Sequence, residues 1–102
     1  MIVKTEFSIE NASATQVMIS GELTRHSISG KQQKVFKNIV VSSSQDIDLS
    51  GVNKIDTAGL AWLIALFEYA TTKQFSISYS QAPQELVKLA QLSGVTDFLP
   101  FT

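Results

Sequence analysis

The sequence predicts an α/β protein in which strands and helices alternate after an initial hairpin. Segments with an apolar residue at every second position alternate along the chain with segments whose apolar residues recur every three or four positions. The chain has 102 residues, of which 44% are hydrophobic, so we expect one folded domain over residues 1–102. The predicted order is β-β-α-β-α-β-α, which favours parallel strands joined by right-handed crossovers.

The first two predicted elements form a hairpin. Apolar and polar residues alternate over residues 3–10 and again over 16–20, and the polar residues 11–14 between them are typical of a turn. We expect Gly21 to end the second strand.

An amphipathic helix is expected over residues 27–40. Its apolar residues share one side, and its three lysines share the other, which is the pattern of a solvated face. The apolar positions are Ile28, Val35, Phe36, Ile39 and Val40, and the lysines are Lys31, Lys34 and Lys37.

In the second half of the chain, predicted strands and helices alternate more regularly. A loop over residues 42–44 leads to a short buried strand over 45–51 and then to a tight connection over 51–56. The elements expected after that connection are a helix over about 58–72, a strand over 75–80, a helix between Pro83 and Gly94, and a tail that docks on the core through Phe98, Leu99 and Phe101.

Composition excludes several classes of function. Eight basic residues against nine acidic ones leave no excess charge for nucleic-acid binding. The chain has no cysteine for thiol chemistry, and neither a GxSxG elbow nor a phosphate-binding glycine loop. The single histidine, His26, could bind a metal together with Glu22, but a lone histidine beside a strand end is far more often an ordinary surface residue or a local hydrogen-bond partner. We therefore expect no catalytic residue, no metal, no cofactor and no enzymatic activity.

The sequence also favours a cytoplasmic protein. The first ten residues alternate apolar and charged side chains, unlike a signal peptide. The longest apolar stretch, residues 60–67, is far shorter than the roughly 20 residues that cross a bilayer, so no direct membrane insertion is expected.

The most informative segment lies where a loop meets the longest helix. Asp56 and Thr57 occupy positions at which a side-chain oxygen can accept hydrogen bonds from the first free backbone N–H groups. One interpretation is therefore an N-cap. The other is a functional hydroxyl, because free donors and the helix dipole also favour a phosphate or a partner's carboxylate at this place.

This segment belongs to a longer pattern, a strand ending in D-L-S followed by D-T-x-G-L at the start of a helix. The positions are Asp48, Leu49, Ser50, Asp56, Thr57, Gly59 and Leu60, preceded by the run Gly21, Glu22, Leu23 and followed by the helical segment over 82–95. The pattern resembles the signature of STAS domains, the fold of bacterial anti-sigma factor antagonists, which reads D-L/F-S and then D-S/T-x-G-L. The resemblance implies a mixed β-sheet with helices mainly on one face and a protein-binding function.

One position distinguishes the branches of this family. In antagonists controlled by phosphorylation, a serine precedes the motif's glycine, where this chain has Ala58. The acidic residue that usually follows the G-E-L match is replaced by Thr24, which departs from both branches. The run D-T-A-G-L-A looks more like the STAS subunit of phospholipid ABC transporters, which implies that Thr57 faces the transporter's ATPase subunit at the inner membrane. The alternative is an anti-sigma factor antagonist in which a kinase-like anti-sigma factor phosphorylates Thr57.

The helix after Thr57 is expected to present a partner surface. At about 100° per residue, one side of the helix forms the core and the opposite side carries small residues and two aromatic ones. The core positions are Leu60, Leu63, Ile64, Phe67 and Ala70. The predicted partner-binding residues are Asp56, Thr57, Ala58, Gly59, Ala61, Trp62, Ala65 and Tyr69. We expect Trp62 to be exposed, unless the C-terminal tail covers this side.

Overall fold

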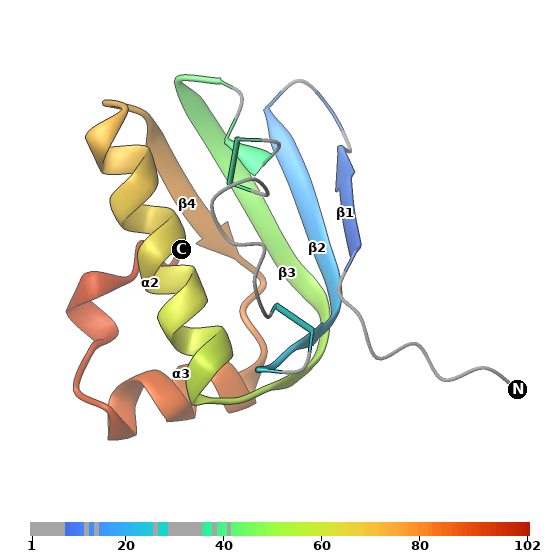
Figure 1. Cartoon of the computed structure of the whole chain (residues 1–102), viewed down its shortest axis with the longest axis vertical. Coiled ribbons are helices and arrows are strands. Elements are labelled where there is room, and N and C mark those ends of the chain that lie inside the picture. Colours follow the sequence, from blue (N-terminus) through green and yellow to red (C-terminus); the bar gives the residue numbers. More distant parts are fainter. Residues whose placement is uncertain are drawn as a thin grey trace, which may run out of the picture.

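The computed structural model shows a four-stranded mixed sheet with helices packed against it (Figure 1). It describes residues 8–11, 13, 15–25, 27–28, 36–37, 39–40 and 42–102. The strands, in sheet order as in sequence order, are β1 (Ser8–Asn11), β2 (Gln16–Leu23), β3 (Ser44–Ile55) and β4 (Ser76–Ser80). The helices are α2 (Thr57–Thr72), α3 (Gln84–Leu92) and a single 3₁₀ turn, η1 (Thr96–Phe98).

The strand pairing confirms the predicted α/β class. β1 runs antiparallel to β2, whereas β2, β3 and β4 are parallel to one another. Side chains along β2 alternate between buried and half-buried, so only one face of the sheet is apolar. Figure 1 shows α2 and α3 on the same side of the sheet. The carboxyl ends of β2 and β3 lie side by side at the start of α2, because Leu23 pairs with Ile55 and the Asp56 N–H donates to the Leu23 carbonyl.

Both inner strands are longer than the sequence predicted. β2 passes through Gly21, which has φ +94°, and the register shift there bends the strand without ending it. β3 likewise passes through Gly51, because Leu23 pairs with Ile55 at the far end of the ladder. A Cβ on Gly51 would lie 2.5 Å from the Cβ of Ser20, so glycine permits this close pairing. The expected tight connection over 51–56 was therefore wrong.

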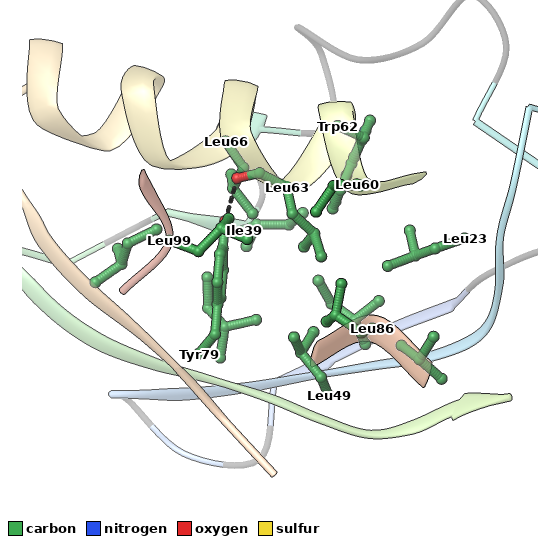
Figure 2. Packing of buried hydrophobic residues seen from close by; sticks show 14 of the residues in the cluster. Leu23, Ile39, Leu49, Leu60, Trp62, Leu63, Leu66, Tyr79, Leu86 and Leu99 are labelled. Carbon is green, nitrogen blue, oxygen red and sulfur yellow. Dashed lines mark hydrogen bonds between the residues drawn. The ribbon is translucent and has the colours of Figure 1, made fainter. Parts of the chain in front are cut away.

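The core lies between the sheet and the helices (Figure 2). The Tyr79 side chain crosses it, and its hydroxyl donates a 2.6 Å hydrogen bond to the Leu63 carbonyl oxygen of α2. Ile39 and Leu49 are completely buried in the same cluster. This bond fixes the distance of α2 from β4.

Part of the chain before β3 contributes to this core. Phe36, Lys37 and Ile39 have helical geometry, and the Val40 N–H donates to the Phe36 carbonyl at 2.9 Å. Lys37 is exposed, whereas Phe36, Ile39 and Val40 are buried, as the helical spacing predicted.

The helix expected over 27–40 does not begin at residue 27, because Ser27 and Ile28 belong to the turn after β2, where both N–H groups donate to the Thr24 carbonyl oxygen. Residues 29–35 and 38, which include Lys31 and Lys34, lie outside the described residues, as do His26 and residues 3–7 of the first predicted strand.

The C-terminal tail docks on the core only in part. Leu99 is buried, and Phe101 forms a parallel bridge with Tyr79 at the edge of β4. Phe98, which we expected to pack on the core, is 61% exposed. The η1 turn ends at Phe98 and the extended residue after it is Leu99, so it is Leu99 that the chain directs inward.

Candidate functional site

The N-terminus of α2 is capped by Asp56. Its Oδ1 accepts a 2.9 Å hydrogen bond from the Gly59 N–H, and its extended backbone is that of an N-cap. Thr57 is the first helical residue and is exposed. Its hydroxyl makes no hydrogen bond with any residue that the structure describes. The cap is thus Asp56, and the Thr57 hydroxyl remains available to a partner.

Asp56 also ties α2 to the end of β2. Its Oδ2 accepts a 3.1 Å hydrogen bond from the Arg25 N–H, and its own N–H donates to the Leu23 carbonyl at 3.3 Å. Burial raises the pKa of the Asp56 carboxyl, but the backbone N–H groups of Arg25, Gly59 and Ala58 and the charge of Arg25 together hold that pKa below its ordinary value. Asp56 is therefore a carboxylate at neutral pH.

Gly59 allows α2 to lie directly against β2. A Cβ at this position would clash with the Leu23 carbonyl oxygen and would lie 2.8 Å from the Leu23 carbonyl carbon. Gly59 is buried and has no side chain to offer a partner. We predicted it as a binding residue, but its observed position gives it a packing role.

The loop after β2 has a fixed conformation beside this junction. The Ser27 Oγ accepts a 3.0 Å hydrogen bond from the Thr24 N–H and donates one of 2.6 Å to the Glu22 carbonyl. Thr24 is buried, 2% exposed, and its hydroxyl donates to the Glu22 carboxylate at 3.5 Å. The loop therefore presents Arg25, which is exposed, at the N-terminal end of α2.

Sequence reasoning missed Arg25 as a neighbour of Asp56. The two residues are 31 positions apart, and their contact depends on the pairing of Leu23 with Ile55 at the ends of β2 and β3. The only available signal was that Arg25 follows the matched residues Gly21 to Leu23.

Trp62 is buried, which contradicts the predicted partner surface at this residue. Its side chain is 2% exposed, and its ring lies 5.4 Å from that of Phe36 between centroids. The alternative was that the C-terminal tail covers this side through Phe98 and Phe101, but Phe98 is exposed and Phe101 packs beside Tyr79 of β4. Trp62 is covered by the chain segment that precedes β3.

The buried side of α2 is rotated by roughly 60° from the predicted one at 100° per residue. Trp62 and Leu66 belong to it, whereas Ile64 and Phe67, predicted as core, are half-buried. The reason is that α2 is apolar on most of its circumference, so the segment at Phe36 can cover a second side. Tyr69 is also on that side, 5.6 Å from the Phe36 ring.

The solvent side of α2 begins at Thr57 and runs the length of the helix. Thr57, Ala61 and Glu68 are exposed, and Ile64 and Ala65 are half-buried. We call these five residues the α2 face. Of the other predicted binding residues, Asp56, Ala58 and Tyr69 are half-buried, at the start and on the flank of the helix. The structure thus brings Thr57, Ala61 and Ala65 together on one surface and separates Gly59 and Trp62 from it.

A polar hollow of about 230 Å³ lies elsewhere, at the amino end of β3 and β4. Asp46 lines it and accepts hydrogen bonds from Gln16 Nε2 at 3.1 Å, Ser78 Oγ at 3.1 Å and Ser80 Oγ at 2.8 Å. These cross-strand bonds occupy the carboxylate, so its role is to join three strands.

The described part of the chain contains neither a cluster of metal-ligating side chains nor a membrane-spanning helix. No group of three His, Asp or Glu side chains within it is arranged to hold a metal ion. Within the same residues, no helix combines the length and the apolar character that a membrane span requires.

Solved structures show where this fold occurs. The anti-sigma factor antagonist SpoIIAA in its unphosphorylated form matches with 17% identity and a TM-score of 0.65, over 94% of this chain and 87% of that one. The Bacillus cell fate determinant SpoIIAA in the phosphorylated form matches with 17% identity and a TM-score of 0.62, over 94% and 90%. An anti-sigma factor antagonist from Mycobacterium paratuberculosis matches with 21% identity and a TM-score of 0.68, over 93% and 82%. At these identities the likeness shows the fold.

The sequence itself identifies the family. No curated protein matches the chain in sequence. The family model described as "Mlab, STAS domain" matches residues 8–100, which span every strand and helix described above. The residues that carried the sequence resemblance, from Asp48 to Leu60, lie at the junction of β3 and α2. This chain therefore belongs to the STAS domain family.

Proposed function

We propose that this protein is a non-enzymatic STAS subunit that binds and supports the ATPase subunit of an ABC-type phospholipid transport system. The observation that carries the proposal is the exposed Thr57 hydroxyl at the start of α2, which has no hydrogen-bond partner among the described residues. The match to a family model named for Mlab supports this branch. In this function the protein is cytoplasmic and peripheral to the inner membrane through its partner.

The composition of the α2 face suits close contact with another protein. Ala61 and Ala65 have short side chains, so a partner's backbone or helix can approach closely, and Ile64 supplies partly exposed apolar area. Thr57 adds a hydroxyl that can donate or accept a hydrogen bond at one end. Glu68 is the only charged residue of the face, and it lies near the other end.

A second candidate function is an anti-sigma factor antagonist controlled by phosphorylation. The solved structures of similar fold include an antagonist in both unphosphorylated and phosphorylated forms. In this chain Ala58 precedes Gly59, so Thr57 is the hydroxyl at this site that a kinase-like anti-sigma factor could modify. The exposure of Thr57 is what both candidate functions require.

The test is co-purification with the ABC-transporter ATPase subunit of the same organism, followed by measurement of affinity and ATPase rate. Thr57→Ala should lower partner-stimulated ATPase activity, and Thr57→Glu should lower it at least as much because a charge would be buried in the contact. Thr15→Ala is the matched control, since Thr15 is exposed and directly precedes Gln16 at the amino end of β2, the opposite end of that strand from Asp56.

The outcomes separate the two candidates. Absence of binding between the wild-type chain and the ATPase subunit would contradict the transport function. Phosphate on Thr57, found by mass spectrometry after incubation with a kinase-like anti-sigma factor, together with a Thr57→Glu variant that behaves as the phosphorylated state, would replace it with the antagonist function.

A further inference from the structure

The α2 face has a cation at one end. The Arg25 N–H is held by Asp56 Oδ2 at 3.1 Å, so the backbone of Arg25 is fixed next to Thr57. Its side chain is exposed, and its guanidinium makes no ion pair with a described residue. The Asp56 carboxylate nearby is already engaged with the N–H groups of Arg25 and Gly59. Arg25 is thus an exposed positive charge on a fixed backbone; it interacts with the Asp56 carboxylate at long range and makes no ion pair within the described part of the chain.

The other end of the face has an anion. Glu68 is exposed, and its side chain makes no ion pair or hydrogen bond with a described residue. The helix supplies no charged neighbour, because the positions three and four residues away hold alanine, isoleucine and threonine. Lys73, on the next turn, lies instead over the Tyr69 ring, 5.8 Å from its centroid.

The two charges are well separated. Glu68 lies eleven positions after Thr57 in the helix, which is roughly 16 Å at 1.5 Å per residue. This exceeds the screening length of about 8 Å at physiological salt, so each charge acts on the part of a partner directly opposite it. Between them the face is uncharged, with Ala61, Ile64 and Ala65.

We propose that Arg25 and Glu68 set the orientation in which a partner docks on the α2 face, the partner placing an acidic side chain opposite Arg25 and a basic one opposite Glu68. This inference rests on the proposed function and specifies the chemistry of its partner. A partner docked in the reverse direction would place like charges opposite each other, which is the usual way an interface excludes a wrong arrangement. Arg25 is thereby assigned to the interface together with Thr57.

Charge reversal tests the proposal on the wild-type complex with the transporter's ATPase subunit. Arg25→Glu and Glu68→Lys should each lower the association rate and raise the Kd by about three- to ten-fold at low salt, with a smaller effect at high salt. The matched controls are Lys88→Glu and Glu85→Lys, which make the same changes in net charge at exposed positions of α3. These should leave Kd and its salt dependence close to wild type, and circular dichroism checks that all four variants are folded.

A rescue experiment tests the orientation. Because the chain has no cysteine, Arg25→Cys carries a crosslinker at a single site and identifies the partner segment opposite it. Replacing an acidic residue of that partner segment by a basic one should restore the partner's affinity for Arg25→Glu but not its affinity for Glu68→Lys. If Arg25→Glu and Glu68→Lys bind no worse than the controls, or if the captured segment has no acidic residue, this inference is wrong while the proposed function stands. If the wild-type chain does not bind the ATPase subunit, both fail together.

Discussion

The Phe36 ring packs against Trp62 with the ring centroids 5.4 Å apart and the planes inclined at 59°. This tilted arrangement is a favourable one for aromatic pairs. The two residues come from different parts of the chain, one before β3 and the other in the first half of α2. Their contact decides that one flank of α2 faces the protein and not a partner.

Trp62 should therefore report a buried environment in the free protein. As the single tryptophan, it should emit at blue-shifted wavelengths and be shielded from acrylamide. Phe36→Ala should increase quenching and lower the free energy of unfolding by about 3 to 5 kcal/mol, and the milder Phe36→Leu should shift both in the same direction. Phe98→Ala is the control, because Phe98 is exposed. A red-shifted, readily quenched emission from the wild-type protein would contradict the observed packing.

Gly59→Ala should destabilise the protein although alanine favours helices. Helix propensity alone predicts a gain of about 1 kcal/mol, whereas the clash of a Cβ with the Leu23 carbonyl predicts a loss of about 2 kcal/mol or more. The comparison is Ala61→Gly, an exposed position where only propensity acts and a loss of about 1 kcal/mol is expected. Urea unfolding measures both, and a more stable Gly59→Ala variant would rule out the close approach of α2 to β2.

Asp56 should make stability depend on pH in acid. Its pKa in the folded protein is below the ordinary value of 3.8, so its ionic contribution is complete above that value and is lost as the pH falls through the folded-state pKa. The difference in unfolding free energy between wild type and Asp56→Asn should shrink in this range. Asp56→Ala should lose about 1 kcal/mol more from the missing cap, and its difference from Asp56→Asn should stay constant with pH because neither variant titrates there. A constant difference between wild type and Asp56→Asn would be inconsistent with this assignment.

Tyr79→Phe should cost about 1 kcal/mol at neutral pH, because the hydroxyl donates a 2.6 Å hydrogen bond to the Leu63 carbonyl. Burial raises the pKa of Tyr79 well above its ordinary value of 10.0. Its contribution is therefore complete below that value and is lost as the unfolded chain ionises at higher pH. The difference from Tyr79→Phe should shrink in alkali, as measured by urea unfolding at a series of pH values. Tyr69→Phe is the control, since the Tyr69 hydroxyl has no hydrogen bond to a described residue, and an equal loss in both variants would count against the Leu63 bond.

Local sequence patterns determined most of the element order. The alternation of serine with apolar residues predicted β4, and Pro83 and Gly94 bracketed α3 as expected. The start of α2 was placed to within one residue, and its capping position was narrowed to Asp56 and Thr57. These features depend on residues a few positions apart, whose preferences act before the chain folds.

Tertiary structure alone decided which side of α2 is exposed and which residues lie beside Thr57. Apolar side chains occupy most of the circumference of α2, so periodicity could not specify a single inward direction, and the contact of Phe36 with Trp62 settled it. Arg25 reaches Asp56 only because β2 and β3 continue through Gly21 and Gly51 to end side by side. Contacts of this kind join residues 26 to 31 positions apart, as the pairs Phe36–Trp62 and Arg25–Asp56 show, and they form when the sheet and helix pack together.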